Sequence, residues 1–383
     1  CFAKLGKYAK STGRCGVSPL EGVAEKTGAR FFLARTLERG EGFPLLKKTR
    51  YKMKALFIGG TGTISMAITK KLLAEGHEVF LLNRGNRNAD LQGNVHFLNV
   101  DVNDEKAVLE KIDGLQFDVV AEFIAFVPSQ LERDYRLFKG RTKQFIFISS
   151  ASAYQKPVGN YVISEKTPLA NPYWEYSRNK IACEDYLYKL YRDEQFPITI
   201  VRPSHTYDER SVPLGVHGDK GSFQVIKRIQ EGKPVIIHGD GTSLWTLTHN
   251  SDFAKGFVGL MGNIHAIGEA VQIMSDESVT WNQIYECIAQ SLGVELKAVY
   301  APSTYLAKHS NYDFTGSLIG DKANSVVFDC SKLKALVPDF VATKRVDQGI
   351  KETVNYVLSH PECQIEDVEF DAWCDKICKE LGE

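Results

Sequence analysis

The sequence predicts an α/β protein built on a doubly wound parallel sheet, with a smaller C-terminal lobe that we expect to hold the substrate. A short apolar run, 55–58, breaks into glycines and then into an amphipathic segment, 66–75, which indicates a strand, a tight turn and a helix. Strand-like and helix-like segments then alternate as far as Val201, which is typical of a parallel sheet covered on both faces. Beyond Pro203 the alternation lapses, so we expect the second lobe to begin there.

The remaining elements follow from the same apolar periodicity. Strands are expected at 78–83, 95–98, 118–121, 144–149 and 198–201, and helices after Asn103, at 129–138 and at 173–192. In the second lobe, the regular segments are expected at 221–231, 234–238, 280–292 and 344–358, together with strands that return to the sheet. Right-handed crossovers between parallel strands give a Rossmann-type sheet, whose ligand lies at the carboxyl ends of the strands.

The composition is that of an ordinary globular protein of 383 residues. The chain contains no run of about 20 apolar residues, the length that a membrane span needs. Its eight cysteines are scattered, without the paired spacing of a metal or redox site. We therefore expect reduced thiols, no metal, no membrane partner and a cytoplasmic protein.

Residues 1–52 differ from the rest of the chain. They hold twelve Lys/Arg against four Glu, and the first methionine is Met53. We expect 1–52 to be a non-native or disordered leader, with an organellar transit peptide as the alternative. The dinucleotide-binding domain is then 53–203, and the substrate lobe with its returning elements is 204–383. The part after the leader is acidic overall, which argues against a broad nucleic-acid surface.

The glycine-rich turn has the composition of a phosphate cradle. Gly59 can adopt backbone angles closed to other residues, and Gly62 lets the main chain approach a pyrophosphate. Thr63 and Ile64 open the following helix, where the amides carry partial positive charge. Ser65 stands where such a turn usually has a third glycine, which weakens the match. A plain surface loop before a helix is the alternative.

The ends of the next two strands are expected to bind the adenosine. An acidic residue after the second strand would repel a 2′-phosphate, but this chain has Asn83, Arg84 and then Arg87 there. This pattern favours NADP, although NAD is possible. Asp101 and Val102 follow the third strand and are expected at the adenine, with a turn or helix-capping role as the alternative for the aspartate.

Tyr176 and Lys180 are four residues apart, so a helix places them on one face. We expect the ammonium to lower the pKa of the phenol, which could then exchange a proton with a carbinol at neutral pH. Ser149 and Ser150 close an apolar strand upstream, and a hydroxyl there can hold the reacting oxygen against the tyrosine. An ordinary amphipathic pair and plain turn serines are the alternatives.

The glycine turn, the strand-end serine and the Tyr-x-x-x-Lys pair, in this order, resemble the extended short-chain dehydrogenase/reductase family over about residues 53–358. By that likeness Ser150, Tyr176 and Lys180 form the catalytic triad, and Lys180 also binds the cofactor ribose. Ser150 is preferred over Ser149 because it lies four residues before Tyr154, as in the family's motif. The resemblance also implies a possible homodimer formed through the long helix that carries the pair.

Two later segments resemble turns of the same family. They are the Arg-Pro turn at 202–207 and the Gly-Asp-Gly turn at 238–242. Other positions depart from its pattern. The family's dehydratases place an Asp-Glu pair after the catalytic hydroxyl, whereas this chain has Ala151 and Ser152, which argues against a 4,6-dehydratase. Trp245 stands where sugar-nucleotide enzymes tend to carry a diphosphate-binding arginine, which puts a nucleotide-diphosphate substrate in doubt.

Four side chains leave alternatives open. Trp245 could stack on a sugar or lie in the core, and His205 and His249 could face the cleft or be structural. Glu122 follows the fourth strand, where the family has small residues, and it could perturb the site or point outward.

The sequence thus predicts an NAD(P)-dependent, epimerase/dehydratase-like oxidoreductase acting on a secondary alcohol of a small, carbohydrate-like substrate. An NADP-dependent carbonyl reductase is the alternative enzyme. An RNA-binding protein, resembling plastid stem-loop RNA-binding proteins, or a cofactor sensor without turnover would use the same fold for a different class of function.

Overall fold

The computed structural model describes residues 52–85 and 91–382. The predicted leader, apart from its last residue, and Arg87 lie outside the described residues. Residues from Lys52 onward form one compact unit. No helix in the part of the chain that is described is long and apolar enough to cross a membrane.

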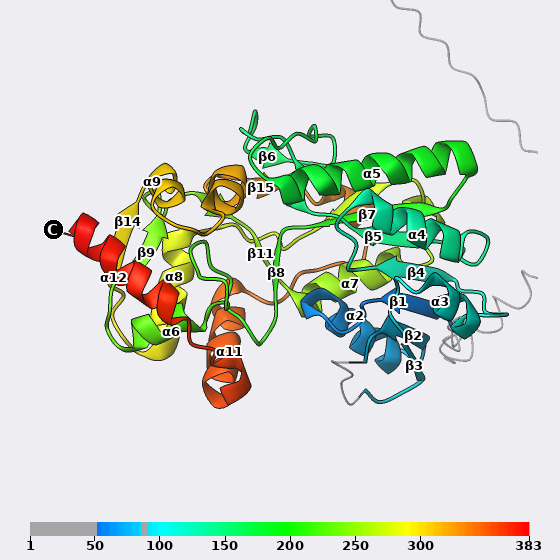
Figure 1. The fold of residues 1–383 in the computed structure, drawn as a ribbon, viewed down its shortest axis with the longest axis horizontal. Coiled ribbons are helices and arrows are strands. Elements are labelled where there is room, and N and C mark those ends of the chain that lie inside the picture. Colours follow the sequence, from blue (N-terminus) through cyan, green and yellow to red (C-terminus); the bar gives the residue numbers. More distant parts are fainter. Residues whose placement is uncertain (1–51, 86–90, 383) are drawn as a thin grey trace, which may run out of the picture. The chain divides into compact units, whose positions relative to one another are not determined.

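A seven-stranded parallel sheet organises the first half of this unit, which confirms the predicted fold class (Figure 1). Its order is β12-β7-β5-β4-β1-β2-β3. The strands are β1 (Lys54–Ile58), β2 (Glu78–Asn83), β3 (Val95–Asn99), β4 (Val119–Glu122), β5 (Phe145–Ile148), β7 (Ile198–Pro203) and β12 (Ala270–Ile273). The order reverses direction at β1, between β2 and β4, so the strand ends open a crevice there for a ligand.

The sheet is covered on both faces because successive side chains of each strand point in opposite directions. In β1, Ala55 and Phe57 join one hydrophobic cluster, whereas Leu56 and Ile58 join another. The first cluster is completed by α2 (Thr63–Ala74) and α7 (Asn250–Leu260). The second is completed by α3 (Glu105–Lys111), α4 (Pro128–Phe138) and α5 (Glu175–Glu194). The continuous apolar runs in the sequence are the result of this double burial.

Local pattern located most of these elements closely. The strand predicted at 78–83 has these bounds in the structure, and helix α5 lies within two residues of its prediction at each end. Helix α2 begins earlier than expected, directly after Gly62. Helix α7, which packs beside α2, was not assigned, and β12, which pairs with β7, is a returning strand of the expected kind whose bounds were not predicted.

The second lobe is a smaller assembly around a two-stranded parallel sheet, at the left of Figure 1. Its strands are β9 (Val235–His238) and β14 (Ala298–Ala301). Around them lie α6 (Phe223–Gln230), α8 (Trp281–Leu292), α9 (Ser303–Lys308), a π-helix (Thr315–Lys322), α11 (Val346–Ser359) and α12 (Val368–Gly382). Helix α10 (Ser331–Leu336) packs instead beside α7 and β12.

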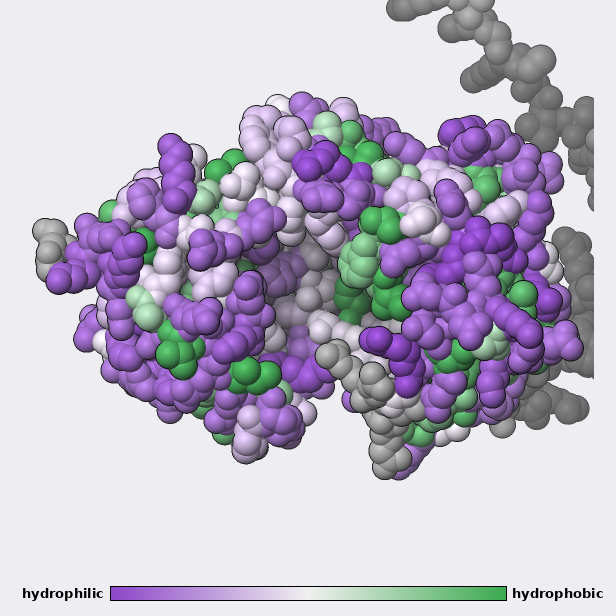
Figure 2. All heavy atoms as spheres, viewed as in Figure 1, coloured by the Kyte–Doolittle hydropathy of each residue, from purple (hydrophilic) through white to green (hydrophobic). Residues whose placement is uncertain are grey.

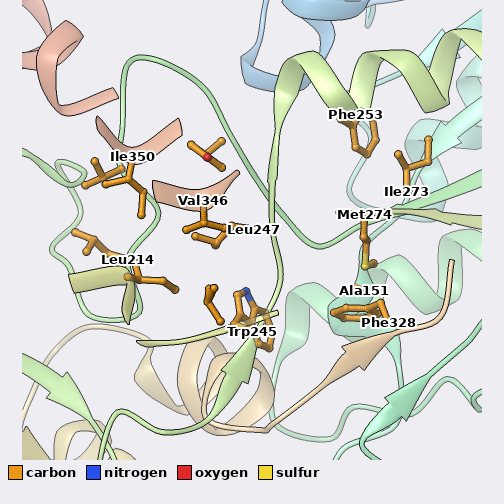
Figure 3. Packing of buried hydrophobic residues seen from close by; sticks show 14 of the residues in the cluster. Ala151, Leu214, Trp245, Leu247, Phe253, Ile273, Met274, Phe328, Val346 and Ile350 are labelled. Carbon is orange, nitrogen blue, oxygen red and sulfur yellow. The ribbon is translucent and has the colours of Figure 1, made fainter. Parts of the chain in front are cut away.

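Three short strand pairs join these parts. They are β6 (Val162–Ile163) with β15 (Val327–Phe328), β8 (His205–Tyr207) with β11 (Leu247–His249), and β10 (Leu244–Trp245) with β13 (Val279–Thr280). Short 3₁₀ turns lie at Ala151–Ala153, Ile264–Ala266 and Pro361–Cys363. Figure 3 shows Trp245 and Leu247 in the same buried cluster as Val346 and Ile350 of α11.

Candidate active site

The glycine turn has the backbone geometry that the sequence predicts. Gly59 has a φ of 86°, and a Cβ built on it would lie 2.5 Å from Cγ2 of Ile124. Gly62 has an ordinary φ of −86°, and a Cβ there would meet only Oγ of Ser65, at 3.6 Å. Backbone conformation therefore requires glycine at position 59, whereas glycine at position 62 leaves the backbone accessible to a ligand.

Ser65 replaces the third glycine without loosening the turn. Its hydroxyl donates to the carbonyl oxygen of Gly59 at 2.9 Å and accepts from the amide of Gly62 at 2.8 Å. The side chain is 1% exposed. The serine that weakens the sequence match therefore links the first and last glycines of the turn through two hydrogen bonds.

A crevice of about 620 Å³ opens beside this turn. Its lining includes the predicted residues Gly59, Gly62, Asn83, Arg84, Asp101 and Val102. The Asn83 side chain accepts from the amide of Gly85 at 2.9 Å, while its buried Nδ2 finds no partner among the described residues. Asp101 accepts from the amide of Asn103, so the aspartate makes a turn and also borders the crevice.

The neighbouring residues Thr63 and Ile64 have different surroundings in the structure. Ile64 lines the neighbouring cavity, where the predicted catalytic residues lie. Thr63 contacts later parts of the chain instead: its hydroxyl accepts from Arg210 at 3.3 Å and its carbonyl oxygen from Asn250 of α7 at 3.1 Å. Only the Thr63 amide, at the start of α2, remains a candidate for cofactor binding.

The residues that border this crevice and were not predicted include Asn103, Gln130 and Arg133. The Arg133 guanidinium donates to the side-chain oxygen of Asn103 at 2.8 Å and to Asp134 at 2.9 Å. Arg133 comes from α4, which reaches this crevice only in the folded chain, so sequence spacing gave no signal for it.

Glu122 points inward, so of the two alternatives left open the outward one is wrong. The side chain is fully buried at the end of β4, and its carboxylate accepts from the amide of Ile124. Burial, with the Asp134 carboxylate beside it, raises the pKa of Glu122 well above its usual value. Glu122 therefore anchors the segment that closes over Gly59.

A second cavity, of about 450 Å³, adjoins the turn and is lined by all three predicted catalytic residues, Ser150, Tyr176 and Lys180. Lys180 is 2% exposed, and its ammonium donates to the carbonyl oxygens of Ala125 and Ile148 at 2.7 and 2.8 Å. Burial lowers the pKa of Lys180 to about 8. The third ammonium proton is available to a ligand.

The expected lowering of the Tyr176 pKa is wrong for this arrangement. Burial raises the pKa of Tyr176, and a hydrogen bond with the Ser150 side chain opposes that rise. The Lys180 ammonium lies 5.8 Å from the centre of the tyrosine ring and is held by the two carbonyl oxygens. Desolvation of the phenol therefore outweighs the Ser150 hydrogen bond, and the Asp321 carboxylate adds to the rise of the Tyr176 pKa.

The structure separates the two strand-end serines. Both serines line the cavity, but Ser149 is 1% exposed and its hydroxyl donates to the buried carboxylate of Glu184. Ser150 faces the cavity and shares a hydrogen bond of 2.9 Å with the Ser152 hydroxyl, which accepts from Ser177 at 2.8 Å. The choice of Ser150 as the candidate catalytic hydroxyl is supported by this placement.

Arg202, of the predicted Arg-Pro turn, is a buried structural residue. Its guanidinium donates twice to Glu184, at 2.9 and 2.6 Å, and lies over the ring of Tyr154. The Tyr154 hydroxyl donates in turn to Gln272 of β12. This network joins α5, β7 and β12 directly behind the strand-end serines.

The second lobe contributes part of the cavity wall, and Figure 2 shows that the face is hollowed between this lobe and the sheet. His205, Trp245, Asp321 and Lys322 line the cavity. His249 is not among the lining residues; it caps α7 through Ser251. Asp321 and Lys322 were not predicted. The sequence hints at this segment only through Gly316 and Gly320, whose lack of side chains lets the π-helix pack against Trp174.

The residues present fit a dinucleotide. The turn leaves backbone open at Gly62, and Asn83 offers an unused donor at the adenosine end. Lys180 borders the adjoining cavity with a proton to spare. A dinucleotide bound across the two cavities would therefore place its reactive end beside Tyr176 and Ser150.

Known proteins share both the sequence pattern and this fold. The chain is 23% identical over 297 residues to the 2′-dehydrokanamycin reductase of Streptomyces kanamyceticus. This match covers 77% of this chain and 82% of that protein. It is 25% identical over 253 residues to the chloroplast stem-loop binding protein of 41 kDa b of Arabidopsis thaliana, with 63% of each chain covered.

Among solved structures, the UDP-glucuronic acid 4-epimerase of Bacillus cereus, in complex with UDP-glucuronic acid and NAD, matches with a TM-score of 0.63. It is 21% identical, and the match covers 80% of this chain and 99% of that one, so the likeness supports the fold. Residues 55–273, more than half of the chain, match the model of the NAD dependent epimerase/dehydratase family. The chain therefore belongs to the NAD dependent epimerase/dehydratase family and is an NAD-dependent enzyme of the extended short-chain dehydrogenase/reductase type.

Proposed function

We propose that this enzyme transfers hydride at a secondary alcohol of a carbohydrate-like substrate, with Ser150, Tyr176 and Lys180 as its catalytic residues. The observation that carries the proposal is that these three side chains line one cavity next to the glycine turn. When bound, the dinucleotide supplies the hydride acceptor or donor.

Each side chain has one role in this reaction. The Tyr176 hydroxyl exchanges a proton with the alcohol oxygen of the substrate, and Ser150 holds that oxygen by a hydrogen bond. The Lys180 ammonium keeps two protons on the carbonyl oxygens of Ala125 and Ile148 and directs the third to the cofactor ribose. Because burial raises the pKa of Tyr176, its resting form at neutral pH is the phenol, which can donate a proton to a keto group.

The resting phenol and the crevice composition favour reduction with NADP. Among the described residues, Asn83 ends β2 and Arg84 follows it; both line the crevice, and neither is a carboxylate that would repel a 2′-phosphate. We expect NADPH to bind more tightly than NADH in a fluorescence titration, and Asn83→Asp to reverse the order. Equal affinities, or an unchanged order in Asn83→Asp, would count against this preference. An epimerase, which returns the hydride to the other face of the same carbon, uses the same residues.

Tyr176→Phe tests the proposal. Loss of the proton-transfer group should lower deuteride transfer from labelled cofactor to a panel of keto sugars by about 100-fold or more. Cofactor affinity should stay within about twofold, because the rest of the site is unchanged. Tyr191→Phe on the same helix, whose side chain is exposed, is the matched control. Failure to bind added dinucleotide, or equal transfer by Tyr176→Phe, would contradict the proposal.

The similarity to a chloroplast stem-loop binding protein favours RNA binding as a second candidate. RNA retention that falls with added salt and is unaffected by Tyr176→Phe, in a protein without hydride transfer, would favour it over the enzyme. A homodimer formed through α5 stays a prediction, which the mass of the native protein tests.

A further inference from the structure

The second lobe brings polar groups to the catalytic cavity that proton and hydride transfer do not use. They belong to Trp245, Asp321 and Lys322, which line the cavity together with Ser150 and Tyr176. Since hydride transfer needs only the alcohol carbon, the proton donor and the cofactor, these groups can bind the rest of the substrate.

Trp245 presents a buried donor. The side chain is 3% exposed, and its Nε1 finds no hydrogen-bond partner within the described part of the chain. An unpaired buried N–H destabilises the folded protein, so we expect a ligand oxygen to accept from it. The ring itself is held by the tilted ring of Trp281, with centres 6.0 Å apart.

Asp321 and Lys322 offer an acceptor and a donor side by side. The Lys322 ammonium lies 3.8 Å from the Asp321 carboxylate, and Asp321 is 7% exposed. Two neighbouring hydroxyl groups can satisfy such a pair at once, because one donates to the carboxylate while the other accepts from the ammonium. Trp174, whose ring lies 5.8 Å from the Lys322 ammonium, lines the same cavity and offers an apolar face.

The pair is held in a fixed position relative to the catalytic serine. Asn171 donates to the carbonyl oxygens of both Gly320 and Ser152, at 2.7 and 2.8 Å. The Lys322 carbonyl oxygen accepts from the indole of Trp281 at 3.1 Å. These bonds tie the end of the π-helix to the strand-end segment, and such support is what a selective site requires.

The charges of the cavity disfavour a diphosphate. No arginine is among the described residues that line it, the charge of Lys322 is balanced by Asp321, and Lys180 is assigned to the cofactor ribose. A diphosphate would therefore meet a carboxylate without a bidentate partner to compensate. The volume of about 450 Å³ must also accommodate the reactive end of the dinucleotide, which leaves room for a compact substrate.

We propose that Trp245, Asp321 and Lys322 select a compact polyhydroxylated substrate without a nucleoside diphosphate. Adjacent hydroxyls of the substrate pair with Asp321 and Lys322, and a third oxygen accepts from Nε1 of Trp245. This inference rests on the proposed function, because it assigns the substrate class of the same site.

The test measures binding to the full chain saturated with oxidised cofactor, with no turnover needed. The probes are the methyl pyranosides of glucose, galactose and mannose, myo-inositol, and UDP, each followed by ligand-observed saturation-transfer NMR. We expect at least one of the polyols to bind, and UDP not to displace it. Asp321→Asn, which keeps the size and loses the charge, and Trp245→Phe, which loses the N–H, should each weaken polyol binding about tenfold or more.

The controls are Asp276→Asn and Trp373→Phe, whose side chains are engaged outside the cavity, with Lys334 and with the His309 carbonyl oxygen. Both should bind the polyol as the unmodified protein does. Unchanged cofactor affinity in all four variants shows that they are folded. The inference is overturned if no polyol binds, if Asp321→Asn and Trp245→Phe bind it unchanged, or if UDP binds and these variants weaken it. Failure of the proposed function shows separately, as absent cofactor binding or as hydride transfer that survives Tyr176→Phe.

Discussion

Replacing Gly59 with alanine should weaken cofactor binding through a contact that the structure defines. At a φ of 86° an alanine costs about 1–2 kcal/mol, because its Cβ approaches the following carbonyl oxygen. The new Cβ would also lie 2.5 Å from Cγ2 of Ile124, whereas carbon atoms pack at about 3.5–4.0 Å. Ile124 must then move by about 1 Å, and such overpacking typically adds about 1–3 kcal/mol.

The displaced side chain is part of the cofactor crevice, since Ile124 lines it together with Gly59. We therefore expect Gly59→Ala to lower the free energy of unfolding by about 2–5 kcal/mol, the sum of the backbone and packing costs. The affinity for the dinucleotide should fall by about tenfold or more. Urea unfolding measures the first quantity, and fluorescence titration measures the second.

Gly76→Ala is the matched control. Gly76 has a φ of 82°, close to that of Gly59, but a Cβ there would have nothing within 4 Å. It should cost only the backbone term of about 1–2 kcal/mol and leave cofactor affinity unchanged. In the double variant Gly59→Ala/Ile124→Ala the contact is removed, so part of the affinity should return. Equal losses of affinity in Gly59→Ala and Gly76→Ala, or normal binding by Gly59→Ala, would refute the reasoning.

Two further predictions concern buried charges. Glu184→Met leaves the Arg202 guanidinium buried without its carboxylate and should destabilise the protein by about 3–5 kcal/mol in urea unfolding. The double variant Glu184→Met/Arg202→Met should recover much of this loss. A double variant as unstable as the sum of the two single variants would contradict the pairing. The Lys180 pKa falls from 10.5 to about 8 on folding, so between these values the unfolded chain binds more protons and stability rises with pH. Between pH 8 and 10.5, the free energy of unfolding of the unmodified protein should therefore rise by about 3 kcal/mol relative to that of Lys180→Met. If this difference does not change with pH, the ammonium is not desolvated.

The sequence by itself determined what depends on short separations along the chain. The strand, turn and helix around Gly59, and the placement of Tyr176 one helical turn before Lys180, follow from backbone conformation and from the periods of 2 and 3.6 residues. Most strands of the main sheet were located for the same reason, because burial on both faces leaves a continuous apolar run.

Only the tertiary structure decided which distant segments meet. It brought Glu184 to Arg202, Arg133 to the crevice beside the glycine turn, and Asp321 with Lys322 to the cavity lined by Tyr176 and Lys180. No spacing rule connects these positions. The tertiary structure also reversed the expected shift of the Tyr176 pKa, because a pKa depends on desolvation as well as on neighbouring charges. Burial is a property of the packed chain, and a motif of five residues does not contain it.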